Sequence, residues 1–111
     1  MCRALKVLCV ATDDGSLAAL KRAVVSAEWE MSPGATDEET AFAQIDAERP
    51  HIMVVFGPYE RLVALTRERF PAMRIVADRD LPGATVVATS VEEARGLVKE
   101  LPRPGGPVRS V

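Results

Sequence analysis

The stretch KVLCVATDDGSLAALKRAV, residues 6–24, changes its hydrophobic pattern partway along, and this change decides the fold class. Residues 6–11 form a continuous rather than an alternating run, which is typical of a strand buried on both faces of a parallel sheet. From Ser16 onward the apolar residues recur at helical spacing, as at Leu20 and Val24. A buried strand followed at once by an amphipathic helix predicts an α/β unit.

The same alternation continues to the end of the chain. Four further apolar runs predict strands at residues 28–31, 52–56, 74–77 and 85–88. Helical patterns follow the second and third of these five expected strands, and a last helix follows the fifth. We therefore predict an α/β domain with a three-layer open sheet of five mostly parallel strands and four helices.

The link between the fourth and fifth expected strands, residues 78–84, is too short for a normal crossover helix. Either an extended segment replaces that helix, or the two strands form a hairpin with its turn at residues 81–83. We favour the extended segment, because a parallel fifth strand lets the final helix return by the usual right-handed crossover.

Composition indicates one globular domain over residues 1–101. The 111 residues are 48% hydrophobic and 27% charged, with a net charge of −2. Residues 102–111 are rich in Pro and Gly and are expected to be a disordered tail.

Charge and cysteine usage limit the partners and the compartment. Both signs of charge are interspersed without a basic stripe, so we expect no nucleic-acid partner. No segment approaches the roughly 20 apolar residues of a membrane span, so we expect no membrane contact. Cys2 and Cys9 form no disulfide framework, which favours a cytoplasmic location.

Acidic residues gather where the first and fourth strands are expected to end. Asp13 and Asp14 follow the first strand, and Asp78 and Asp80 follow the fourth. The carboxyl ends of parallel strands meet at one rim, where four carboxylates could hold a Mg2+ ion. The simpler interpretation, which we favour, needs no cofactor: Asp14 or Ser16 caps the helix that follows.

Two other helix starts carry a capping-box pattern, in which a hydroxyl residue is followed three positions later by Glu. They are Thr36 with Glu39 and Ser90 with Glu93.

A ligand site at the same rim is the other interpretation of these turns. A small molecule could lie across Gly15–Ser16, Gly57–Pro58 and Thr89–Ser90, with an anionic part near helix N-termini. Alternatively, Gly57–Pro58 is an ordinary strand-to-helix turn with Pro in the first helical turn. The sequence contains no GxGxxG and no P-loop, so a nucleotide fingerprint is absent.

Catalytic chemistry has little support in this sequence. The single histidine, His51, is expected at the amino end of the third strand, opposite the rim. Cys9 lies mid-strand and should be buried and inert. Because no nucleophile with its base can be assembled, we expect no catalytic residues.

The order of elements, the stretch DDGSLAALKRAV at residues 13–24 and the stretch RPHIMVVF at residues 49–56 resemble the receiver domains of two-component response regulators. The resemblance covers residues 5–101. It implies a flavodoxin-like fold with strand order 2-1-3-4-5. It also implies that Asp13 and Asp14 match the acidic pair that holds magnesium in that family.

The other residues that receiver domains use for phosphorylation are not matched in this sequence. The phosphoacceptor position falls on Phe56 or Gly57, and neither has a carboxylate. The family's Ser or Thr after strand four is replaced by Ala77 or Asp78, and Thr89–Ser90 stands where its lysine is expected. The helix before strand five, part of the usual output face, is missing.

The resemblance therefore implies a pseudo-receiver that cannot be phosphorylated in the usual way. We expect a non-catalytic signalling or regulatory module that contacts a protein partner or a second copy of itself. The alternative is a small-molecule or metal-binding sensor that uses the rim formed by residues Asp13 to Ser16, Gly57–Pro58 and Asp78 to Asp80.

Overall fold

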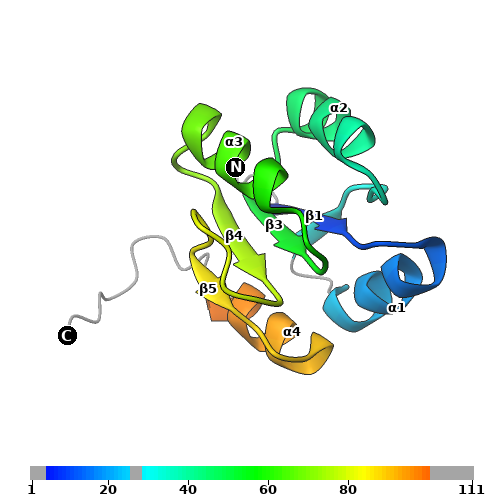
Figure 1. The fold of residues 1–111 in the computed structure, drawn as a ribbon. Helices are drawn as coiled ribbons and strands as arrows, with labels where there is room; N and C mark the ends of the chain where they lie inside the picture. Colours follow the sequence, from blue (N-terminus) through cyan, green and yellow to red (C-terminus); the bar gives the residue numbers. More distant parts are fainter. Residues whose placement is uncertain (1–4, 26–28, 101–111) are drawn as a thin grey trace.

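The computed structural model describes residues 5–25 and 29–100 (Figure 1). The tail predicted for residues 102–111, the residue Cys2 and the first residue of the predicted strand 28–31 lie outside these ranges. None of the described helices is long and apolar enough to cross a membrane.

The described residues form a single sheet with helices on both sides. The elements, in chain order, are β1 (Leu5–Val10), α1 (Asp14–Val24), β2 (Trp29–Met31), α2 (Glu38–Glu48), β3 (Ile52–Val55), α3 (Glu60–Arg69), β4 (Arg74–Ala77), β5 (Val86–Val87) and α4 (Val91–Glu100). The sheet order is β2-β1-β3-β4-β5, and every pairing is parallel. The predicted fold class and strand order are confirmed, including the absence of a helix between β4 and β5.

Strand alternation divides the core into two layers. On β1, Leu8 and Val10 belong to one buried cluster, whereas Val7 and Cys9 belong to the other. The first cluster includes Ala41, Ile45, Leu62 and Val63, from α2 and α3, and the second includes Leu20, Val24, Ala94 and Val98, from α1 and α4. Figure 1 shows α2 and α3 on one side of the sheet and α1 and α4 on the other. Burial of β1 on both faces explains why its residues 7–10 are continuously apolar.

An extended segment replaces the missing helix, so the hairpin alternative is wrong. Val76 and Val86 are register partners in a parallel pairing. The connecting residues close onto the α2–α3 side, where Leu81 is buried in the core. A Cβ at Gly83 would lie 3.3 Å from Cβ of Arg67, so the segment approaches α3 closely.

Strand β5 is shorter than the predicted run of residues 85–88. The Thr85 amide donates to the carbonyl of Ile75 (2.8 Å), while the Thr85 hydroxyl accepts from the Ile75 amide (3.0 Å). The Thr85 hydroxyl thus replaces a backbone carbonyl as the acceptor for the Ile75 amide, and the strand begins at Val86.

Trp29, on the edge strand β2, belongs to the core. Its side chain is buried, and the indole Nε1 donates to the carbonyl of Val24 (3.1 Å). This bond ties β2 to the end of α1 and satisfies the only polar atom of the ring.

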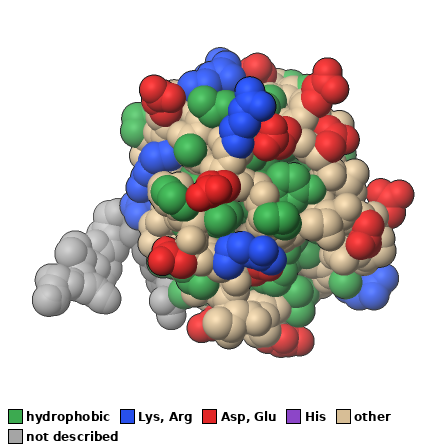
Figure 2. All heavy atoms as spheres, viewed as in Figure 1, with side chains coloured by type: hydrophobic (Ala, Val, Ile, Leu, Met, Phe, Trp, Pro, Cys, Tyr) green, Lys and Arg blue, Asp and Glu red, His purple; other side chains and the backbone are tan. Residues whose placement is uncertain are grey.

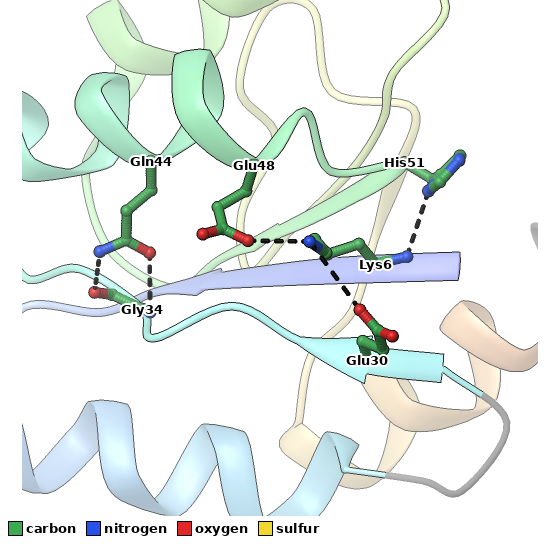
Figure 3. A network of polar contacts seen from close by, with 6 residues as sticks. All are labelled: Lys6, Glu30, Gly34, Gln44, Glu48 and His51. Atoms are coloured by element: carbon green, nitrogen blue, oxygen red, sulfur yellow. Dashed lines mark hydrogen bonds and ion pairs between the residues drawn. The ribbon is translucent and has the colours of Figure 1, made fainter. Parts of the chain in front are cut away.

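Charged side chains meet at the amino end of the sheet (Figure 3). The Lys6 ammonium lies 2.9 Å from a carboxylate oxygen of Glu48 and 3.8 Å from one of Glu30. The hydrogen bond to Glu48 and the nearby negative charges raise the pKa of Lys6. The Lys6 backbone amide donates to Nδ1 of His51 (3.1 Å), which places His51 at this end, as predicted.

Figure 3 also shows a paired amide contact between α2 and the segment after β2. The Gln44 side chain donates to the carbonyl of Gly34 (2.6 Å) and accepts from the Gly34 amide (2.9 Å). This contact holds the β2–α2 connection against the helix.

Candidate functional site

The segments that follow the five strands meet at one edge of the sheet. We call residues 11–13, 32–37, 56–59, 78–85 and 88–90 the carboxyl rim. All ten residues named as site candidates from the sequence lie on this rim or in the first turn of α1.

Asp13 is the N-cap of α1. Its Oδ1 accepts from the backbone amide of Ser16 (2.7 Å), and its backbone is extended, with φ −153° and ψ 170°. The capping interpretation is therefore confirmed, but the capping residue is Asp13 rather than Asp14 or Ser16. The helix begins at Asp14, earlier than predicted, and Asp14 adds negative charge to its first turn.

The cap of α2 differs from the sequence prediction by one residue. Asp37, not Thr36, is the N-cap, and its carboxylate accepts from the Thr40 amide (2.7 Å) and hydroxyl (3.1 Å). These hydrogen bonds lower the pKa of Asp37.

The predicted capping box before α4 is present in a shifted form. The Glu93 amide donates to the Ser90 hydroxyl (3.1 Å), as expected. The Glu93 carboxylate accepts from the amide and hydroxyl of Thr89 (both 2.7 Å), and these bonds lower the pKa of Glu93. Thr89 and Ser90 are thus engaged in starting the helix.

The turn after β3 depends on a glycine. Gly57 has φ +145°, a conformation that residues with a Cβ rarely adopt. A Cβ there would lie 2.7 Å from Cγ2 of Thr12 and 3.0 Å from the Tyr59 ring. Pro58 is exposed and precedes Tyr59, the N-cap of α3, so it does not lie in the first helical turn.

Tyr59 links three segments of the carboxyl rim. Its hydroxyl lies 2.8 Å from the carbonyl of Ala11 and 2.8 Å from that of Thr36. Because a phenol has one proton, it donates to these two carbonyls in a shared arrangement. Partial burial and the charges of Asp37 and Glu38 raise the pKa of Tyr59.

Asp78 joins the end of β4 to the turn after β3. Its Oδ1 accepts from the Gly57 amide (3.2 Å) and from Nε of Arg79 (3.0 Å), and its Oδ2 accepts from the Arg79 guanidinium (3.1 Å). This two-point pair raises the pKa of Arg79. The candidate carboxylate at this position therefore already holds a cation, supplied by the next residue.

Two of these contributors were not identified from the sequence. The sequence pattern places Tyr59 among the apolar residues of a helix, and only its position next to the Gly57–Pro58 turn indicates that it lies at the rim. Arg79 stands between two acidic residues in the sequence, and that alternation was the available signal.

The acidic candidates do not assemble into a multi-carboxylate metal centre. Within residues 5–25 and 29–100, no group of three or more His, Cys, Asp or Glu side chains is placed to hold a metal ion. Asp13 Oδ1 is engaged with the Ser16 amide, and Asp78 is engaged with Arg79. A smaller magnesium site at Asp13 and Asp14 stays a prediction.

The positions compared with the phosphorylation site have structural roles. Phe56 directly follows β3, donates its amide to the carbonyl of Val10 (2.8 Å) and packs against the α1–α4 side of the core. Ala77, at the end of β4, is fully buried.

A pocket of about 300 Å³ opens at the rim between α1 and α4. Its polar lining comes from Thr12, Ser16, Asp78 and Arg79, and its apolar lining from Ala19, Leu20, Phe56 and Val91. Gly57 completes it. The strand order reverses between β1 and β3, because the chain continues from β1 to one edge of the sheet and from β3 to the other. Ligands in open α/β sheets bind at such switch points.

The structure thus brings together three of the predicted ligand residues, Ser16, Gly57 and Asp78. The other candidates do not line this pocket: Asp13, Asp14, Gly15, Pro58, Asp80, Thr89 and Ser90.

Surface charge is mixed on the face of the molecule shown in Figure 2. On the face shown in Figure 2, Lys and Arg side chains are interspersed with Asp and Glu side chains around a central group of hydrophobic ones.

The fold is that of response-regulator receiver domains. Chemotaxis protein CheY4 of Vibrio cholerae superposes with a TM-score of 0.71 at 17% identity, covering 87% of this chain and 98% of that chain. Other receivers with this fold come from Methanospirillum hungatei and Pseudomonas putida. No protein-family model matches the sequence, and no curated protein is significantly similar to it.

Two further similar structures are larger. A signal receiver domain of an HD domain-containing protein from Pseudomonas fluorescens Pf-5 has a TM-score of 0.60 at 15% identity over 68% of this chain, which spans 63% of that chain. A cobalamin-binding protein from Desulfitobacterium hafniense has a TM-score of 0.66 at 12% identity over 87% of this chain and 58% of that chain. The same fold therefore occurs in a receiver domain and in a cobalamin-binding protein.

Proposed function

We propose that this chain is a receiver-like signalling module that binds a protein partner constitutively and is not switched by aspartyl phosphorylation. The observation that carries the proposal is Phe56, an apolar residue directly after β3 in a receiver fold. A phenyl ring cannot form an acyl phosphate. The cytoplasmic location expected from the cysteines belongs to the same proposal.

The hydrogen bonds of the carboxyl rim support a surface that is preset rather than switched. Tyr59 holds the segments after β1 and β2, and Asp78 holds the turn after β3. These bonds form between groups of the chain itself and require no added phosphoryl group.

The absence of aspartyl phosphorylation can be tested with a chemical phosphodonor. After incubation with acetyl phosphate and magnesium, intact-mass measurement should show no added phosphoryl group. A response regulator with an intact aspartate phosphoacceptor serves as the positive control. A stable phospho-adduct on this chain would overturn the proposal.

We assign the docking surface to the edge strand β5. Val87 is 40% exposed on this two-residue strand, beside the segment that replaces the missing helix. Burial of an exposed apolar side chain against a partner removes its surface from water and favours association. The partner is a second copy of the chain or a signalling protein encoded beside it.

A matched pair of variants tests this assignment. Val25 is 50% exposed, but it lies at the end of α1. Val87→Glu should abolish dimerisation measured by light scattering, or binding to the neighbouring signalling protein measured by calorimetry. Val25→Glu should leave either association unchanged. A monomer that binds no such protein would contradict the docking function.

The second candidate function is a small-molecule sensor, favoured by the pocket between α1 and α4. The cobalamin-binding protein of similar fold supports the idea that this architecture accommodates a ligand. A thermal-shift screen against metals, nucleotides and metabolites should give a concentration-dependent rise in melting temperature if this function applies.

A further inference from the structure

We propose that the pocket between α1 and α4 binds a small, uncharged molecule with a planar, apolar body. This inference rests on the second candidate function and gives it a ligand class. Three properties of the pocket lead to it: its lining, its charge and its size.

The lining offers an apolar contact that includes one aromatic ring. Phe56 packs on the α1–α4 side of the core and also borders the pocket, so its ring is partly buried and partly available. Leu20 and Ala19 from α1 and Val91 from α4 line the pocket as well. An aromatic or heteroaromatic ring can stack on Phe56 and remove this apolar surface from water.

The charges of the pocket disfavour an ionic ligand. Asp78 and Arg79 are the two charged lining residues, and they bind each other at two points. An anion would have to compete with the Asp78 carboxylate for Arg79, and a cation would have to compete with Arg79 for Asp78. Because Asp78 and Arg79 already contact each other at two points, a ligand ion would gain only the difference between its own ionic contact and the one that it replaces.

An uncharged ligand leaves this pair intact. The hydroxyl-bearing residues Thr12 and Ser16 line the same pocket and can orient such a ligand through hydrogen bonds.

Size limits the ligand further. A volume of about 300 Å³ is at the lower end of the range for small-molecule sites. The pocket therefore fits one ring or a fused pair of rings with short substituents.

The experiment uses three probes with the same ring and different charge. Benzamide is neutral, benzoate is anionic and benzamidine is cationic. Each is titrated into the full chain while amide chemical shifts are followed by NMR. We expect benzamide to bind with a millimolar Kd and to shift the amides of Thr12, Ser16 and Gly57. Benzoate and benzamidine should bind about tenfold more weakly, a difference of about 1.4 kcal/mol.

Two substitutions on one helix provide the control. Ala19 lines the pocket and Ala18 does not, and both side chains are exposed on α1. Ala19→Phe should fill the pocket and weaken benzamide binding at least about tenfold. Ala18→Phe makes the same chemical change on the same helix and should leave the Kd unchanged.

Three outcomes would overturn the inference. They are equal benzamide affinity in Ala19→Phe and wild type, equal or tighter binding of either charged probe, and no shift of pocket amides at any soluble benzamide concentration. The light-scattering and mass measurements of the docking function do not depend on these titrations, so the two proposals can fail separately. A thermal-shift hit without benzamide binding would keep a sensor function while rejecting this ligand class.

Discussion

The two ends of the sheet use polar side chains in different ways. At the amino end, Lys6 pairs with Glu48 and Glu30, side chain to side chain. At the carboxyl rim, the side chains of Asp13, Asp78 and Tyr59 bind backbone groups of neighbouring segments.

The polar contacts at the amino end lie on a solvated surface, whereas those at the carboxyl rim fix the positions of loops. The Lys6 and Glu48 side chains are 28% and 34% exposed, and ion pairs with such access to water contribute little to stability. Side chains that bind backbone groups fix the path of the loops, and loops on a rigid scaffold commonly carry function. The rim is therefore the end of the sheet where small changes should have large effects.

The largest expected effect is at Gly57. Gly57→Ala places a Cβ 2.7 Å from Thr12 in a backbone conformation that disfavours it. We expect a loss of about 1–3 kcal/mol in the free energy of unfolding by urea. Gly96→Ala in α4, where a Cβ meets no atom within 4 Å, should instead stabilise the protein by about 0.5–1 kcal/mol. Equal effects at the two glycines would remove the distinction between the rim and an ordinary helix surface.

Tyr59→Phe should have the next largest effect. Without the hydroxyl, the carbonyls of Ala11 and Thr36 lose a donor, which should cost about 1–2 kcal/mol. Hydrogen exchange of the Ala11 amide, bonded to the carbonyl of Ala35, should become faster. Unchanged exchange would mean that Tyr59 does not join these segments.

The same variant has a pH signature. The raised pKa of Tyr59 means that the unfolded state loses its proton first as pH rises. The contribution of the protonated Tyr59 hydroxyl to the free energy of unfolding is therefore complete below the ordinary tyrosine pKa. It is lost as pH rises past the raised pKa. Tyr59→Phe should lack this part of the alkaline loss of stability.

A smaller effect is expected at Asp13. Asp13→Ala removes an N-cap and should destabilise the protein by about 1 kcal/mol. Asp14→Ala, in the first helical turn, should cost about half of that or less. Thermal unfolding with and without MgCl2 distinguishes capping from metal binding. A magnesium-dependent rise in Tm that both substitutions abolish would favour the metal site.

The smallest effect is expected at the amino end. Lys6→Met removes the pair with Glu48, and its destabilisation should be weaker than that of Asp13→Ala and should fade with added NaCl. Since the pKa of Lys6 is raised, the contribution of the pair is present below the ordinary lysine pKa and is lost as pH rises past the raised value. A large loss in the free energy of unfolding that does not depend on salt would mean that the two ends of the sheet do not differ in this way.

Sequence pattern predicts the fold well because burial acts on whole segments. The continuous apolar runs at residues 7–11 and 52–56 lie in interior strands of the sheet, where both faces are covered. The link after residue 77 is too short for a crossover helix, and no helix lies between β4 and β5.

The candidate site was predicted only in part, because it depends on contacts between distant segments. Capping at the acidic pair was recognised, but the choice of Asp13 over Asp14 depends on backbone geometry. The two-carbonyl contact of Tyr59 joins residues 23 and 48 positions apart in sequence, and no local pattern reports such a contact. The pairing of Asp78 with Arg79 likewise requires a side-chain orientation that the sequence does not contain.

Trp29 is the only tryptophan in the chain, and its surroundings determine what fluorescence can detect. Its indole is buried beside α1 at the edge strand β2, in the cluster on the α1–α4 side, and it is hydrogen-bonded to Val24. Emission should therefore report the detachment of this edge when the chain unfolds. The turn at Gly57 and Tyr59 contains no second indole, so events there call for an introduced chromophore or for NMR.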